Sequence, residues 1–252
     1  MSESLAKATP RQPSGGKRPP IIFDYHLKFD DGGTKDFRIR LDPVTLQLLA
    51  PQTASHPAWT AIGFARCPNC TLDASTHPHC PVAVAMVDVV DGFKDSLSYH
   101  SVDVTVTTAQ RQYSLRTSLQ SALSSITGIY MTTAGCPIMD RMRPMVESHL
   151  PFASQEETIY RTVSMYLFAQ FALARNNQQP DWTLDRLMAY LVEVGVVNTA
   201  FCGRLNQVPH LGDANVNALA ILDSLASLTA ITIEGGRLEK WEALMLRHWQ
   251  LG

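Results

Sequence analysis

The chain has 252 residues, 45% of them hydrophobic, and a formal net charge of -2 at pH 7. This length and composition suit a globular protein of one large domain or two small ones. A net charge so close to zero gives no bulk attraction to nucleic acid or to an anionic membrane, so neither is expected as a partner.

The five cysteines indicate a reducing compartment, because their number is odd and a chain of this size needs no disulfides to hold a core. The N-terminus lacks the apolar segment of a secretory signal. Stretch 117–139 is uncharged but interrupted by serine, threonine and glycine, and stretch 163–174 is too short to span a bilayer. We therefore expect a cytoplasmic protein without a transmembrane helix.

Residues 1–20 contain four prolines and no apolar periodicity, which predicts a disordered basic tail. Two alternating segments then flank the turn-forming residues 30–33. This pattern predicts a β-hairpin whose buried face carries Phe23, Tyr25, Phe37 and Ile39.

Three cysteines follow a predicted strand over residues 61–65. Cys67 and Cys70 have the C-x-x-C spacing, which lets a tight turn direct both sulfurs at one cation. Cys80 comes later, flanked by His77 and His79. This loop predicts a metal site that lacks one ligand, since tetrahedral zinc takes four thiolate or imidazole ligands.

Cys136 is the predicted fourth ligand. Like Cys80 it precedes a proline, and proline favours the first position of a helix. We expect helices after Pro81 and Pro137, the first ending near Gly92. The backbone N–H groups and dipole at a helix N-terminus favour a thiolate, which both metal binding and redox chemistry require.

Alternation returns over residues 102–107 and 113–116 and predicts a second hairpin, so the first half is expected to be an antiparallel sheet with one helix. From about residue 117 the apolar spacing becomes helical. The clearest helix begins at Ser154, where Glu157 completes a capping box. Because it is apolar almost all round, we expect it at the centre of a bundle, with the buried residues Tyr160, Val163, Leu167 and Phe171. Further helices are expected over residues 184–191 and from Asp213 to Gly235.

Three interpretations of the cysteines stay open. The first is a metal site of Cys67, Cys70, Cys80 and Cys136, with zinc preferred to an iron–sulfur cluster because cluster motifs more often space their cysteines closely. The second is a dithiol redox centre at Cys67 and Cys70. The third is a set of buried free cysteines. His77 or His79 can replace one thiolate, and Cys202 is left over.

A separate polar group follows the last candidate ligand. Asp140, Arg143 and His149 can form a pocket beside the metal, with His149 as an acid or base. The alternative is a set of ordinary ion pairs between residues three and four positions apart on a helix surface. No phosphate-binding loop, dinucleotide fingerprint or nucleophile elbow is present.

The motifs C-P-x-C…H-C-P and G-C-P, the latter followed by Asp140, Arg143 and Pro144, resemble those of an uncharacterised bacterial family, a domain of unknown function. The resemblance extends over roughly residues 20–230 and includes Leu150-Pro151-Phe152-Ala153. It implies a bacterial cytoplasmic protein, but it does not imply any particular activity.

The sequence thus predicts an α+β fold, with a tail over 1–20, an antiparallel sheet with one helix over 21–116 and a mostly helical bundle over 117–252. A cysteine-rich metal site is expected at the junction. The leading function is structural zinc binding, which leaves no open position for catalysis. The alternatives are a redox or electron-transfer protein using the same cysteines, and a small-molecule enzyme with its pocket between sheet and bundle.

Overall fold

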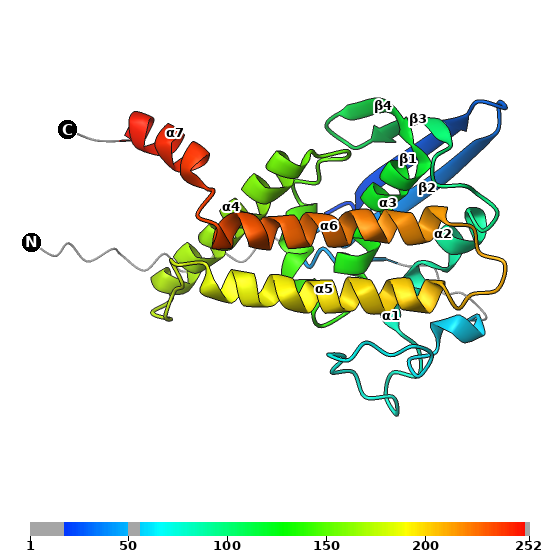
Figure 1. Cartoon of the computed structure of the whole chain (residues 1–252), viewed down its shortest axis with the longest axis horizontal. Helices are drawn as coiled ribbons and strands as arrows, with labels where there is room; N and C mark the ends of the chain where they lie inside the picture. The colour runs from blue at the N-terminus through cyan, green and yellow to red at the C-terminus, as the bar shows by residue number, and fades with distance from the viewer. Residues whose placement is uncertain (1–17, 50–55, 250–252) are drawn as a thin grey trace, which may run out of the picture.

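The computed structural model describes residues 18–49 and 56–249 (Figure 1). The predicted tail therefore lies almost wholly outside the described residues. The elements in chain order are β1 Ile21–Phe29, β2 Thr34–Leu41, the 3-10 helix η1 Ala58–Thr60, α1 Pro81–Ala85, α2 Val87–Gly92, β3 Ser101–Thr107, β4 Gln112–Ser118, α3 Leu119–Thr133, the 3-10 helix η2 Met139–Val146, α4 Gln155–Arg175, α5 Asp185–Leu205, α6 Ala214–Glu234 and α7 Glu239–Trp249.

The four strands form one antiparallel sheet in the order β2-β1-β3-β4. The first hairpin has the predicted register, with Tyr25 opposite Phe37 and Phe23 opposite Ile39. Its turn needs Gly32, whose φ of 86° favours glycine. Phe37 is only half-buried, because β2 is an edge strand; its ring stacks on Phe93. The predicted second hairpin is also present, as β3 and β4.

Helices cover the apolar face of the sheet. α6 packs against both α3 and α5, and Figure 1 shows α5 and α6 side by side. Buried residues of the sheet, of α3 and of α5 belong to one continuous core. Both predicted regions, 21–116 and 117–252, contribute to this core.

The prediction that the helix after Ser154 is the most buried one is wrong. The capping box is present, but α4 buries only Ile159, Thr162 and Gln170, and Phe171 is 49% exposed. The inward stripe is largely polar: the Gln170 side chain accepts a hydrogen bond from the Asp181 backbone N–H at 2.8 Å. When a helix is apolar on several faces, its sequence does not show which face is buried. In this fold much of the apolar surface of α4 faces outward.

Three shorter segments also differ from expectation. Residues 61–65 form turns after a single bridge between Ala61 and His79, so the strand predicted there is wrong. The helix after Pro81 is present but breaks at Met86 into α1 and α2. The segment after Pro137 is a 3-10 helix rather than an α-helix, and Pro144 inside it removes a hydrogen-bond donor.

α6 ends at Gly235 as predicted, although Asp213 does not cap it with its side chain. The Asp213 carboxylate instead accepts hydrogen bonds from the backbone N–H and the hydroxyl of Ser98, both at 2.8 Å. Among the described residues, α6 is the one helix long and apolar enough to cross a membrane by length and composition. The expectation of no transmembrane helix did not consider this segment, and in this fold α6 packs against α3 and α5.

Candidate functional site

The cysteine-rich loop, residues 56–80, is called the knuckle below. Its first two cysteines lie on a tight turn, in which the Cys70 N–H donates to the Cys67 carbonyl at 3.1 Å. Its end returns beside its start, because the Cys80 N–H donates to the Thr60 carbonyl at 2.8 Å. Cys80 is the residue immediately before α1. The knuckle thus folds back on itself and holds its three cysteines on one compact loop.

Cys136 lies between the end of α3 and the start of η2. It follows Gly135, whose φ of 100° lets the chain turn sharply out of α3. Burial raises the pKa of Cys136, while hydrogen bonds from the backbone N–H groups of Met139 and Ile138 act in the opposite direction. Two N–H donors directed at one sulfur are an environment that a thiolate favours.

The structure brings the knuckle and Cys136 into one region. Burial, followed by the nearby thiols of Cys80, Cys136 and Cys70, raises the pKa of Cys67 to about 11. All five cysteines are free thiols. Over residues 18–49 and 56–249, no three histidine, cysteine, aspartate or glutamate side chains form a group that can hold a metal ion in this arrangement. The four thiols therefore lie in one region, but their sulfur atoms are not arranged as ligands of one metal ion.

Two of the knuckle's three histidines, His77 and His79, form hydrogen bonds with hydroxyl groups of their own loop. His79 Nδ1 lies 2.9 Å from Thr60 Oγ1, and its ring packs edge-on against His56. His77 Nδ1 lies 2.9 Å from Thr76 Oγ1, and the residue is exposed.

Arg204 of α5 anchors the knuckle. It is only 1% exposed, and its Nη1 donates to the carbonyls of Trp59 at 2.6 Å and Ala61 at 2.8 Å. Its Nη2 donates to the carbonyl of Ala65 at 3.2 Å. Ala65 has a φ of 50°, a conformation that non-glycine residues adopt only when their surroundings hold them there. The guanidinium also opposes the rise in the Cys67 pKa, so a buried positive charge lies near this thiol.

A second contact attaches the knuckle to α5. The Asn69 amide donates to the Glu193 carboxylate at 2.6 Å and to the Glu193 carbonyl at 3.0 Å. The knuckle projects beside α5, as Figure 1 shows in cyan and yellow. The knuckle is therefore attached to α5 at two places along the helix.

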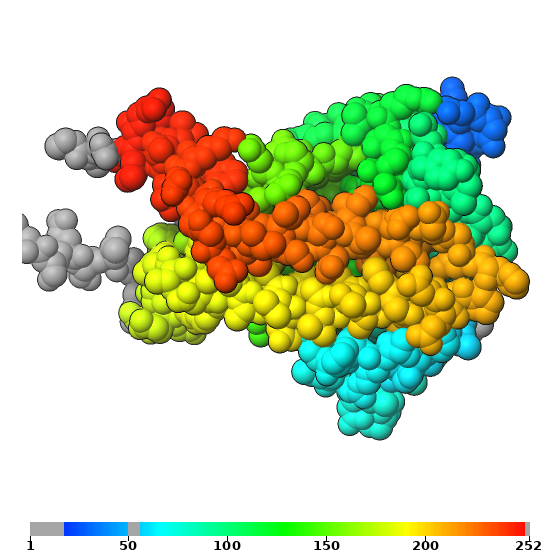
Figure 2. Space-filling model, in the orientation of Figure 1, coloured from blue at the N-terminus to red at the C-terminus, as the bar shows by residue number. Residues whose placement is uncertain are grey.

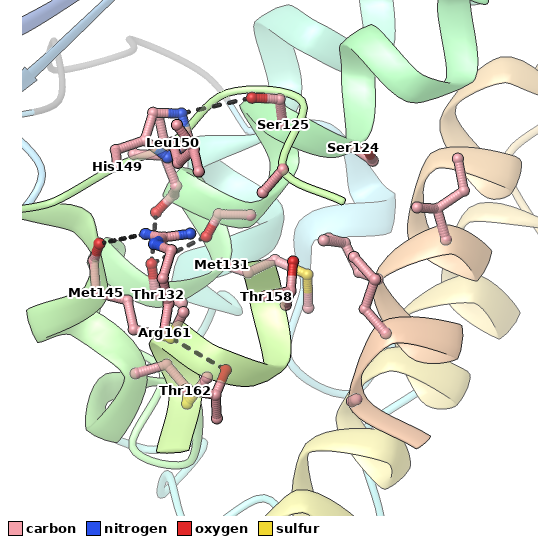
Figure 3. Close-up of a pocket in the computed structure, with 18 of the residues that line it drawn as sticks. Ser124, Ser125, Met131, Thr132, Met145, His149, Leu150, Thr158, Arg161 and Thr162 are labelled. Atoms are coloured by element: carbon pink, nitrogen blue, oxygen red, sulfur yellow. Dashed lines mark hydrogen bonds between the residues drawn. The ribbon is translucent and has the colours of Figure 1, made fainter. Parts of the chain in front are cut away.

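The polar group predicted near Cys136 is only partly assembled. Asp140 and Arg143 form an ion pair three residues apart, and Arg143 also donates to the Thr45 carbonyl at 3.2 Å. Neither is among the residues that line the cavity of about 370 Å³ between α3, η2, α4, α5 and α6, whereas His149 is. Figure 3 shows His149 and Ser125 at this cavity.

His149 does not have the environment of a catalytic base. Burial, together with the nearby charge of Arg161, lowers its pKa to about 3, so the imidazole is neutral near pH 7. Its Nε2 lies 2.7 Å from the Tyr25 hydroxyl and 3.4 Å from the Ser125 hydroxyl. Within the described part of the chain no carboxylate orients the ring, so this cluster lacks the third member of a nucleophile–base–acid arrangement.

Sequence reasoning missed this cavity, although one signal was available. Met139, Met142 and Met145 recur every third residue and all line the cavity. A 3-10 helix has three residues per turn, so this spacing places all three side chains on one face of η2.

These features define an α+β protein in which a four-stranded antiparallel sheet carries a helical layer and a thiol-rich loop. The chain belongs to the family described as Domain of unknown function (DUF6901), whose model matches residues 23–245. The expected membership in a family of unknown function is thereby confirmed. Neither a curated protein nor a solved structure matches the chain.

Proposed function

We propose that the protein binds zinc through Cys67, Cys70, Cys80 and Cys136, and that the metal fixes the knuckle to the helical half. The observation that carries the proposal is the gathering of four thiols from two distant segments into one region. Four thiolates fill the tetrahedral shell of zinc, so the site is structural and leaves no position for substrate.

The charges around the thiols fit this role. Zinc with four thiolates carries a net charge of about -2, and such an anion is costly to bury without compensation. Arg204 supplies a buried positive charge near Cys67, and the two N–H groups directed at Cys136 stabilise a second thiolate.

Metal binding requires the thiols to move inward to sulfur–zinc distances of about 2.3 Å. The knuckle suits such a movement because Cys67, Cys70 and Cys80 lie on turns and at a chain bend, outside regular secondary structure. Free thiols suit the reducing cytoplasm that we propose for the protein. A reactive dithiol is less favoured, since redox cysteines have lowered pKa values and the pKa of Cys67 is raised.

The test is the metal content of protein purified without oxygen and without added metal. We expect about one zinc ion per chain and a colourless sample. Cys136→Ser should lose most of the zinc and melt at a lower temperature, because the free energy of metal binding is also folding free energy. The matched control is Cys202→Ser, which should retain the metal, since the Cys202 thiol on α5 contacts the Val216 carbonyl of α6 at 3.9 Å.

Two results would overturn the proposal. A brown sample with iron and sulfide would assign an iron–sulfur cluster to these cysteines. A protein that binds no zinc even after addition of the ion, with unchanged melting in Cys136→Ser, would leave the four thiols as ordinary buried cysteines.

A further inference from the structure

The cavity of about 370 Å³ beside His149 has no cysteine among its lining residues. We propose that it binds a linear aliphatic carboxylate of medium chain length. Three features support this ligand class: a mainly apolar and adaptable wall, one cation at the polar side, and a volume that fits a single short chain.

The wall is built for an aliphatic chain. Met139, Met142 and Met145 of η2 and Met131 of α3 line the cavity together with aliphatic residues of α5 and α6. Methionine side chains are flexible and polarisable, so they adapt to a chain without a fixed shape. Figure 2 shows the surface hollowed beside α6, where that helix faces the green segments of the chain.

The polar groups lie on the other side of the cavity. Figure 3 shows Arg161, His149 and Ser125 there, opposite the side chains that come from α6. A cavity with a polar side and an apolar side fits an amphipathic ligand better than a uniformly apolar one.

Arg161 is the group that selects a negative charge. Its Nη2 donates to the carbonyls of Met145 at 3.0 Å and Ser148 at 2.9 Å, both neutral acceptors. Its Nε is buried without a hydrogen-bond partner, and among residues 18–49 and 56–249 Arg161 makes no ion pair. A half-buried guanidinium that pairs with no carboxylate of the described chain is a good partner for the carboxylate of a ligand.

The ionisable groups near Arg161 do not compete with a carboxylate ligand for its guanidinium. Its nearest acid, Glu157, lies one helical turn away and is held by the Ser154 backbone N–H at 2.7 Å as part of the capping box. His149 is neutral near pH 7 and provides a polar surface without competing charge.

The volume limits the length of the chain. One water-sized group occupies about 30 Å³ in a liquid, so the cavity holds roughly a dozen such groups. A ten-carbon carboxylate has about that number of heavy atoms and fits the small end of ligand pockets, which span roughly 300–1,000 Å³.

The experiment measures binding of decanoate to the full chain by calorimetry, below the concentration at which the ligand aggregates. Decanol and decyltrimethylammonium serve as ligands with the same chain but a neutral or positive head. We expect decanoate to bind roughly tenfold or more tightly than either, because only it pairs with Arg161. A series from hexanoate to hexadecanoate should be tightest near decanoate.

Two variants locate the site. Arg161→Gln keeps a hydrogen-bond donor but removes the charge, so it should abolish the preference for decanoate while decanol binding persists. The matched control is Arg175→Gln, an exposed arginine at the end of the same helix, which should leave binding unchanged. Ala226→Phe fills the cavity from α6 and should weaken both ligands.

Absence of decanoate binding to the natural protein would overturn the proposal, as would equal affinity for decanol. Should Arg161→Gln fail to fold, judged by its circular dichroism, Ala226→Phe decides: unchanged binding of decanoate in that variant would place the ligand elsewhere. None of these outcomes depends on the zinc content of the sample.

Discussion

Arg204→Met tests how strongly α5 holds the knuckle. The change removes three hydrogen bonds from a buried guanidinium to the carbonyls of Trp59, Ala61 and Ala65. A hydrogen bond to a charged group contributes about 1.5–3 kcal/mol, so the three would sum to roughly 4.5–9 kcal/mol. Removing the cation also removes the cost of burying it. We therefore expect a net loss of about 3–5 kcal/mol in the free energy of unfolding.

The assay is urea unfolding in the presence of a chelator, so that metal binding does not contribute. A loss of 3–5 kcal/mol corresponds to a fall of roughly 6–20 °C in melting temperature for a chain of this size. The control is Arg247→Met, since Arg247 is exposed on α7 and should change stability by less than about 0.5 kcal/mol. A loss below about 1 kcal/mol in Arg204→Met would show that these contacts do not anchor the knuckle.

Three further outcomes follow from buried groups. Tyr25→Phe removes the hydroxyl that contacts both Ser125 and His149, and should cost about 1–3 kcal/mol in urea unfolding; a neutral result would mean that water replaces the hydroxyl. Because the folded pKa of His149 is lowered to about 3, its contribution to stability is present above about pH 6.5 and is lost as the pH falls toward 3. His149→Gln should therefore flatten the dependence of the urea midpoint on pH between 6.5 and about 4, and an unaltered slope would assign the acid sensitivity to other groups. Phe201→Ala on α5, where the side chain is 1% exposed, should cost about 3–5 kcal/mol, whereas Phe168→Ala on α4, where it is 72% exposed, should cost less than about 0.5 kcal/mol. Equal losses at the two positions would contradict the burial described for α4 and α5.

The sheet was predictable because its signal is local. Alternation over Phe23, Tyr25 and Leu27 decides which face is buried, and the turn around Gly32 decides the register. The capping box at Ser154 was predictable for the same reason, since both partners lie within one helical turn.

The burial of α4 was not predictable, because it depends on where η2 and α6 pack. Its sequence offers more than one apolar face, and tertiary contact selects the one with Ile159 and Thr162. The contacts of Arg204 were also beyond prediction, since an arginine within a helix gives no indication that it reaches backbone carbonyls in a distant loop. The cavity draws on several separate elements, so only the methionine spacing on η2 was visible in the sequence.

The contact between Arg204 and Trp59 spans 145 residues of chain. Synthesis proceeds at about 5–20 residues per second, so Trp59 is made roughly 7–30 seconds before its partner exists. During that interval the knuckle has no docking surface on α5, and its thiols face solvent and whatever metal or oxidant the surroundings hold. Cys136 is made earlier than Arg204. An ion bound by the four thiols on the nascent chain would therefore shape the loop before α5 arrives to fix it.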